Sequence, residues 1–173
     1  MRARAFWKAV TADGSDFLDR LIGLLRDHEI RYCVVGGQAV NADAEPVVSL
    51  DLDLVVAVDQ LAQVEALMRA AFTVKPSAKG LDISAHGSDL VVQLQTDPRY
   101  FAFVDGAAVR EVLGIQLPIA RPEDVLQGKI WAVMDETRRP SKRQKDLADI
   151  ARLLEAHPDL RRQVPADVLA RLV

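Results

Sequence analysis

The chain has 173 residues, of which 50% are hydrophobic and 27% are charged. These values are typical of a globular protein, and the length suits one compact domain with a substantial core. The formal net charge of −3 argues against indiscriminate nucleic-acid binding. The lone Cys33 excludes an internal disulfide and is expected to be a buried structural thiol, and the three histidines lack zinc-ligand spacing.

Neither a membrane span nor a secretion signal is expected from the sequence. No apolar run approaches the roughly 20 residues that a spanning helix needs. Residues 1–8 contain no long apolar stretch of the kind that forms the centre of a signal peptide. We therefore expect a cytoplasmic protein with no membrane partner.

Hydrophobic periodicity predicts that strands and helices alternate along most of the chain. The expected elements are, in order, a helix over 16–28, a strand over 32–35, a helix opening at 38–43, a strand over 50–58, a helix over 60–71, weak strands at 72–75 and 81–84, a firmer strand over 90–95, one strand within 111–120, helices over 122–137 and 141–157, and a helical tail over 160–173. This order indicates an α/β or α+β fold. We expect a core over 1–120 and a C-terminal helical segment over 121–173 packed on it.

A glycine pair follows the first predicted strand. Gly36 and Gly37 end the run Tyr32–Val35 and precede a predicted helix. Glycines between a strand and a helix let backbone N–H groups approach a phosphate closely. A tight turn with no ligand uses the same residues, so on this feature alone both interpretations stay open.

Two aspartates share one face of the second predicted strand. Asp51 and Asp53 lie on that face because side chains alternate along a strand, and Leu52 and Leu54 take the other. The two carboxylates repel each other, and a hard divalent cation such as Mg²⁺ turns this repulsion into attraction. The alternative is a pair of acids on a wet strand face. Against it, the same face becomes apolar at Val55, which favours a metal site.

The combined pattern resembles a known family. A hydrophobic-Gly-Gly turn, a short helix and then Asp-hydrophobic-Asp-hydrophobic are similar to the minimal nucleotidyltransferases of the polymerase-β-like superfamily, above all to bacterial nucleotidyltransferase-like proteins that include toxin–antitoxin components. The resemblance covers residues 30–95 well. It implies a nucleotidyltransferase-like mixed sheet flanked by helices, an NTP bound at Gly36 and Gly37, and Mg²⁺ or Mn²⁺ bound by Asp51 and Asp53.

The sequence departs from this family at the third carboxylate. The resemblance implies an acidic residue in the middle of a later strand, where it activates the acceptor hydroxyl. The matching residue is Gln93, whose amide is no general base and is a weaker Mg²⁺ ligand than a carboxylate. Asp89 and Asp97 share its strand face but lie about 13 Å away at about 3.3 Å per residue, too far to replace it. We expect Gln93 to project into the cleft beside the aspartates, and transfer to be slow or absent.

A locally basic stretch occupies the predicted C-terminal helices. Lys129 falls in the apolar stripe of its helix, where it either reaches the solvent edge or points into the cleft toward phosphate. Ser141 is expected to cap the next helix, so Lys142, Arg143 and Lys145 crowd the positive end of that helix dipole. A bound anion explains this arrangement better than a solvated charged turn, although both stay open.

The sequence therefore predicts Mg²⁺-dependent transfer of a nucleotidyl group from an NTP to an RNA, a protein or a small molecule. The residues expected to carry it are Asp51, Asp53 and Gln93 at the catalytic centre, and Gly36, Gly37, Lys129, Lys142 and Lys145 around the nucleotide. A second hypothesis is a catalytically impaired binding module of the same fold, which Gln93 supports. A third is a structural partner in a toxin–antitoxin pair, whose helical tail docks a cognate protein.

Overall fold

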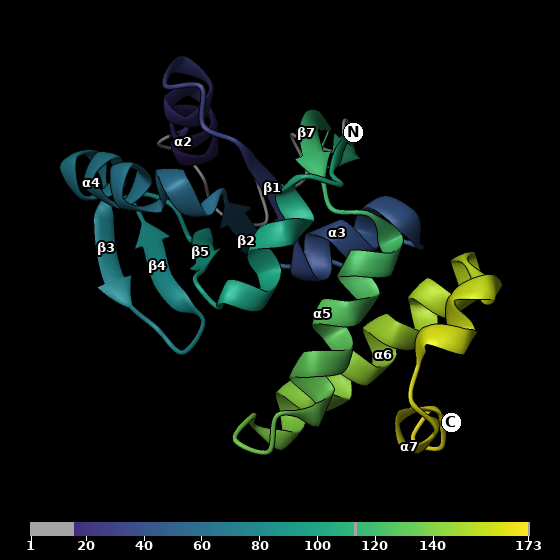
Figure 1. Ribbon diagram of the computed structural model, residues 1–173. Helices are drawn as coiled ribbons and strands as arrows, with labels where there is room; N and C mark the ends of the chain where they lie inside the picture. The colour runs from purple at the N-terminus through teal and green to yellow at the C-terminus, as the bar shows by residue number, and fades with distance from the viewer. Residues whose placement is uncertain (1–15, 113, 173) are drawn as a thin grey trace.

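A mixed sheet of seven strands forms the centre of the described molecule (Figure 1). The computed structural model describes residues 16–112 and 114–172. The sheet order is β3-β4-β5-β2-β1-β7-β6, in which β2 pairs with β5 and β1 with β7 in parallel and the other neighbours are antiparallel. The strands are β1 (Tyr32–Val35), β2 (Asp51–Val56), β3 (Thr73–Pro76), β4 (Gly80–Ser84), β5 (Val91–Gln95), β6 (Ala108–Val112) and β7 (Ile115–Ile119).

Helices pack around this sheet, which confirms the mixed α/β architecture expected from the sequence. Helices α5 and α6 run side by side at the opposite end of the molecule from α2 and α4 (Figure 1). The helices are α2 (Phe17–Asp27), α3 (Gly36–Asp43), α4 (Leu61–Ala71), α5 (Pro122–Met134), α6 (Pro140–Ala156) and α7 (Ala166–Leu169), with 3-10 turns at Val58–Gln60, Pro98–Val104 and Pro158–Gln163. No helix among the described residues is long and apolar enough to cross a membrane.

One sequence-based expectation about these elements is incomplete and another is wrong. The strand expected within 111–120 is β7, but the sequence did not predict β6, which pairs with it antiparallel. Ser141 does not cap α6, since the helix begins at Pro140 and Arg139 occupies the N-cap. Proline suits the first helical position because its fixed φ matches the helix and its missing N–H would have no partner there.

Other differences concern element ends. The strand expected over 50–58 stops at Val56, and Leu50 and Val58 are exposed, so the apolar stripe of this strand is shorter than the sequence suggested. The helical tail expected over 160–173 is a 3-10 turn followed by the single turn α7. Residues 1–8, on which the signal-peptide expectation rests, lie outside the described part of the chain. Leu113 and Val173 lie outside it as well.

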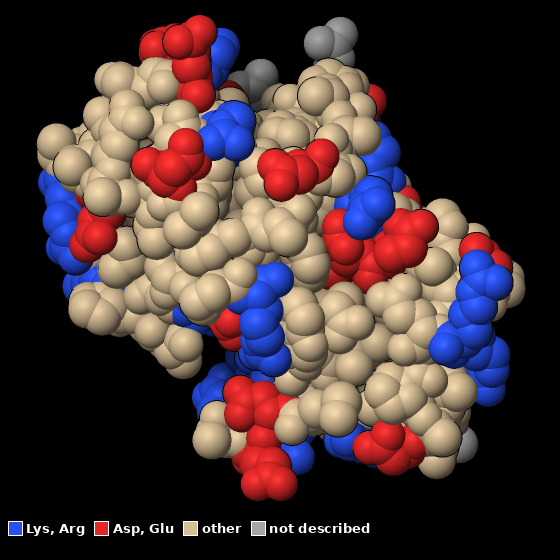
Figure 2. Space-filling view, viewed as in Figure 1, with Lys and Arg blue, Asp and Glu red and all other residues tan. Residues whose placement is uncertain are grey.

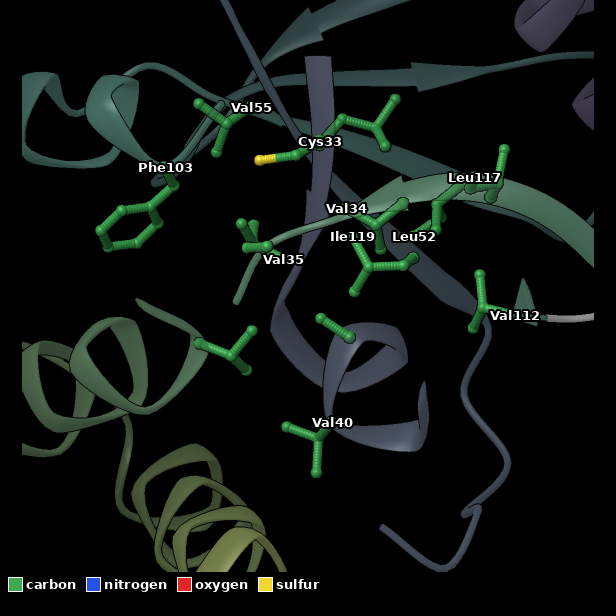
Figure 3. Close-up of a cluster of buried hydrophobic side chains, with 14 of the residues drawn as sticks. Cys33, Val34, Val35, Val40, Leu52, Val55, Phe103, Val112, Leu117 and Ile119 are labelled. Carbon is green, nitrogen blue, oxygen red and sulfur yellow. The ribbon is translucent and has the colours of Figure 1, made fainter. Parts of the chain in front are cut away.

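The core beneath the site is built from both faces of β1 (Figure 3). Cys33 and Val55 are paired neighbours of β1 and β2 and lie on the side of Phe103, whereas Val34 lies beside Ile119. Cys33 is fully buried, and this burial, with a smaller effect from the charge of Asp124, raises the pKa of its thiol to about 12. A thiol in this state is not a nucleophile at neutral pH, which confirms the expected structural role.

Candidate active site

The glycine pair forms the junction between β1 and α3. Gly36 adopts φ +68°, a left-handed conformation that strongly favours glycine, at the first position of α3. A Cβ built on Gly36 would lie 2.1 Å from Oδ2 of Asp53, so the absence of a side chain also lets β2 approach this turn. A Cβ built on Gly37 would meet no atom within 4 Å. The first glycine is thus required by geometry, and the second borders open space.

Asp51 and Asp53 project from one face of β2. The alternation predicted from the sequence is present, because Leu52 and Leu54 are buried while both aspartates are partly exposed. The Asp53 side chain is only 12% exposed, and its Oδ2 lies 3.2 Å from the Lys79 ammonium. Its Oδ1 is buried and has no hydrogen-bond partner among the described residues. A buried carboxylate oxygen without a donor is costly, and a bound cation would remove that cost.

Gln93 lies immediately beside Asp53. The two residues are Cα partners in the parallel pair of β5 and β2, so their side chains share one sheet face. Asp82 is the partner of Gln93 on its other side in β4, and it accepts a 3.4 Å hydrogen bond from the Gln93 amide. Asp53, Gln93 and Asp82 therefore form one row across the adjacent strands β2, β5 and β4. In the described part of the chain, no group of three or more His, Cys, Asp or Glu side chains is placed to hold a metal ion.

A cavity of about 790 Å³ opens in front of these residues. Its size falls in the range of ligand-binding pockets. It is bordered by all eight residues singled out from the sequence: Gly36, Gly37, Asp51, Asp53, Gln93, Lys129, Lys142 and Lys145. Figure 2 shows basic side chains inside the hollow between the sheet and the C-terminal helices, with acidic side chains at its lower rim. Residues from opposite ends of the sequence thus meet at one site.

Lys129 is held by acids of α6 and does not reach the solvent edge. It is 9% exposed, and its Nζ lies 3.1 Å from Asp146 and 2.8 Å from Asp149. Burial alone lowers the pKa of this ammonium, but the charges of Asp149 and Asp146 outweigh burial and raise it. Arg138 also pairs with Asp146. This network of ion pairs, which the sequence analysis did not identify, fixes Lys129 and Arg138 in the wall of the cavity and largely neutralises their charges.

The basic turn of α6 divides into two groups. Lys142 and Lys145 border the cavity and form no ion pair with any described acidic side chain, since Asp146 and Asp149 are engaged by Lys129, Arg138 and Arg152. Arg143 does not border the cavity, and its Nε is buried without a partner among the described residues. Because α6 begins at Pro140, Lys142 and Arg143 lie in the first turn and Lys145 in the second. Two of the three cations therefore face a prospective anion.

The structure also brings residues to the cavity that sequence reasoning missed. Lys79 arrives from the hairpin between β3 and β4, and Arg99 lies 4.6 Å from the ring centre of Trp131. Tyr100 donates a 3.3 Å hydrogen bond to the carbonyl of Gly128, and a Cβ on that glycine would crowd the Tyr100 ring at 3.0 Å. The sequence contained no local signal for these contacts, because each joins residues far apart along the chain.

Comparison with known proteins identifies the fold. No protein-family model matches the chain, and no curated protein matches it in sequence. Among solved structures, the antibiotic-resistance factor ANT(2'')-Ia in complex with adenylyl-2''-tobramycin superposes with a TM-score of 0.61 at 12% identity, over 90% of this chain and 97% of that chain. An antigenic nucleotidyltransferase-like protein from Paracoccidioides brasiliensis gives 0.55 at 17% identity, over 96% and 87%. The chain has the fold of these nucleotidyltransferases, as the sequence resemblance implied.

Proposed function

We propose that this protein transfers a nucleotidyl group from an NTP to a hydroxyl acceptor with Mg²⁺ or Mn²⁺. The observation that carries the proposal is Asp53. Its carboxylate lies beside Asp51 and the Gly36 turn on the floor of the cavity, and one of its oxygens is buried without a described donor. Structural likeness to nucleotidyltransferases supports the same reaction class.

The residues of the site fit a divalent cation. Asp51 and Asp53 supply hard anionic oxygens, and Gln93 adds a neutral amide oxygen beside them. Mg²⁺ in such sites is held by one or two carboxylates together with substrate phosphates. When bound, the ion would neutralise phosphate charge during transfer. Two carboxylates and a nucleotide therefore suffice as a ligand set.

The chain's own groups then position the nucleotide and stabilise the leaving group. We assign the backbone N–H groups of Gly36 and Gly37, at the uncapped N-terminus of α3, to phosphate oxygens. The acceptor oxygen bonds to the α-phosphorus, the bond from that phosphorus to the β-phosphate bridging oxygen breaks, and pyrophosphate leaves. Lys142 and Lys145, which have no acidic partner in the described part of the chain, attract the departing anion.

Among the described residues, no strong base is placed to accept the proton of the acceptor hydroxyl. Gln93 cannot accept it. Of the other acids that border the cavity, Asp97 pairs with Arg99, Asp146 with Lys129 and Arg138, and Asp124 with Arg121. Hydrogen bonds from Arg99 lower the pKa of Asp97, and hydrogen bonds from Thr137 lower that of Asp135. The proton therefore passes to water, and transfer is slow. The same observation favours a second candidate function, a nucleotide-binding module that retains the fold with little or no catalysis.

The free cations favour a polyanionic acceptor. Lys142 and Lys145 border the cavity without acidic partners in the described part of the chain, and Arg139 adds a third basic side chain beside them. An RNA end satisfies this charge because every nucleotide adds a phosphate. A protein hydroxyl, as in a toxin–antitoxin partner, and a small molecule are the other acceptors we propose to test.

Label transfer decides between the two functions. The purified protein is incubated with α-³²P-labelled NTPs, Mg²⁺ or Mn²⁺, and either total RNA or cell lysate. Transfer of label to RNA or protein that is lost in Asp53→Asn supports the enzyme. NTP binding by calorimetry without any transfer supports the binding module. Absence of both NTP binding and transfer contradicts the proposed function.

A further inference from the structure

Lys79 is fixed by its backbone in a tight hairpin turn at the edge of the cavity. Ser77 and Gly80 exchange backbone hydrogen bonds of 3.0 and 3.2 Å, which leaves Ala78 and Lys79 as the two turn residues. The Lys79 carbonyl accepts a 3.1 Å hydrogen bond from the Thr96 N–H at the end of β5. A Cβ on Gly80 would approach the Leu94 carbonyl to 2.4 Å, so this turn packs closely on β5. The starting point of the Lys79 side chain is therefore well defined.

From this turn the Lys79 side chain spans β5 to reach β2. Strand β5 lies between β4 and β2 in the sheet, and the Lys79 Nζ lies 3.2 Å from Oδ2 of Asp53. Every other basic residue that borders the cavity and pairs with an acid in the described chain uses a different acid: Arg99 uses Asp97, Lys129 and Arg138 use Asp146. Lys79 is thus the cation assigned to the aspartate pair.

This ion pair leaves the carboxylate half satisfied. Lys79 engages Oδ2, while Oδ1 remains buried without a described partner. An ammonium ion carries one positive charge, and the pair of Asp51 and Asp53 carries two negative charges. A divalent cation on the same carboxylates would balance both negative charges. It would also repel the Lys79 ammonium, which lies 3.2 Å from Oδ2 of Asp53. Lys79 and a divalent cation therefore compete for Asp53.

We propose that Lys79 is a displaceable counterion that holds Asp53 while no divalent cation is bound and turns to a phosphate of the nucleotide when one is. This inference rests on the proposed function and adds a nucleotide-binding residue to it. The Lys79 side chain is 31% exposed and its flexible stem permits the rotation, whereas its backbone stays anchored. The triphosphate supplies the anionic oxygens that replace Asp53 as its partner.

Opposite effects on two ligands test this role. Lys79→Met removes the charge and keeps most of the side-chain length. Titration with Mn²⁺ alone should show tighter binding than in the native protein, because a competing cation is gone. Titration with α,β-methylene-ATP and Mg²⁺ should show weaker binding, because a phosphate partner is gone. We expect each change to be about tenfold, the size of one hydrogen bond to a charged group.

A second variant and a matched control isolate the charge. Lys79→Gln retains a donor for Asp53 without the charge. Like Lys79→Met, it should bind Mn²⁺ more tightly and the ATP analogue more weakly than the native protein does. Lys75→Met removes an exposed lysine of the same hairpin that does not border the cavity, and it should change neither. Mn²⁺ should also raise the melting temperature of Lys79→Met more than that of the native protein, a readout independent of catalysis.

The outcomes separate this inference from the proposed function. Mn²⁺ binding that requires Asp53 but is unchanged or weaker in both Lys79 variants overturns the counterion role and leaves the metal site intact. Unchanged nucleotide affinity overturns the phosphate contact. If neither the native protein nor either Lys79 variant binds Mn²⁺ alone, the counterion role fails; the proposed function fails with it only if none of these proteins binds α,β-methylene-ATP with Mg²⁺.

Discussion

Gly36 touches Asp53 so closely that a Cβ on the glycine would stand 2.1 Å from the aspartate Oδ2. The turn after β1 and the acidic strand β2 are therefore one unit, although 17 positions separate the two residues in the sequence. Because Val35 is also the register partner of Asp53, the end of β1 fixes where the carboxylate lies. This contact explains why a glycine stands at position 36 independently of any ligand.

The two glycines should respond differently to a methyl group. Gly36→Ala forces a side chain into a left-handed conformation and against Asp53, and should lower the free energy of unfolding by about 2 kcal/mol or more. Gly37→Ala meets open space and should fold like the native protein, while its methyl group narrows the phosphate site and weakens NTP binding. Urea unfolding and calorimetry measure the two effects. Equal stability of both variants contradicts the steric role of Gly36.

Removal of the aspartate charges should strongly weaken divalent-cation binding. In Asp51→Asn/Asp53→Asn the anionic ligands become amides, which are poorer ligands for Mg²⁺. Calorimetry with Mn²⁺ and an NTP should show at least a tenfold loss of affinity, about 1.4 kcal/mol. Asp89→Asn is the matched control, because Asp89 is an exposed acid just before β5 that does not border the cavity. Native-like binding by the double variant rules out this metal site.

The elements that carry the site were predictable because their signals are local. Strand β1 is a short apolar run ended by glycine, and β2 alternates acids with leucines, so both strands and the shared face of Asp51 and Asp53 follow from the sequence. The strand face of the Gln93 side chain followed from the same alternation. These features need only neighbouring residues to be recognised.

The missed features depend on contacts between distant segments. Lys79 reaches Asp53 only because β5 lies between β4 and β2, and hydrophobic periodicity does not specify strand order. To predict the partners of Lys129 from the sequence, one must also notice that Asp146 and Asp149, three residues apart, fall among the buried residues of α6. Two acids inside an apolar stripe predict a buried cation opposite, and that signal was present in the sequence.

Lys129 should be important for folding, because it is the buried partner of two acids. Lys129→Met leaves Asp149 and Asp146 short of a buried partner and should lower the free energy of unfolding by about 3 kcal/mol. Because the pKa of Lys129 is raised in the folded state, its contribution is fully present below the ordinary lysine pKa and declines only as the pH rises through the raised value.

Urea unfolding of both proteins from neutral to strongly alkaline pH measures this contribution. The difference between native protein and Lys129→Met should stay constant near neutral pH and shrink only in the alkaline range. A difference that disappears already near pH 7 contradicts a charged, buried Lys129. Met134→Lys, at an exposed position of the same helix, is a control for altered charge on α5.

The basic turn should contribute to polyanion binding through Lys142 and Lys145. Lys142→Gln/Lys145→Gln removes two unpaired cations from the cavity and should weaken binding of a short single-stranded RNA. The slope of the logarithm of affinity against the logarithm of salt concentration should become shallower by about 1.4. Arg161→Gln/Arg162→Gln, in the exposed turn after α6, removes the same charge elsewhere. If both double variants lose equal affinity, net charge alone explains the effect and the turn is not a specific site.

Gln93 decides how well the site binds metal and whether it can withdraw a proton. Gln93→Glu or Gln93→Asp places a carboxylate beside Asp53, its register partner, and completes three acids on one sheet face with Asp51. A neutral ligand becomes an anionic one, so Mn²⁺ affinity in the presence of an NTP analogue should rise about tenfold. The new acid also faces Asp82, which now accepts a hydrogen bond from the Gln93 amide. This added repulsion lowers the stability of the metal-free variant and strengthens its demand for a cation.

The carboxylate should also accelerate transfer, because it adds a general base next to the acceptor, an effect worth about 10²-fold or more. Gln95→Glu is the matched control: it introduces the same charge on the same strand face and also borders the cavity, but it lies two residues further along β5. Paired Mn²⁺ titrations and label-transfer assays compare the native protein, both Gln93 variants and this control. Equal Mn²⁺ affinity in the native protein and the Gln93 variants removes position 93 from the metal site, because a carboxylate that binds the ion must raise the affinity above that of an amide. Robust transfer by the native protein would instead mean that the proton leaves through another route, and that the amide at this position is no obstacle to catalysis.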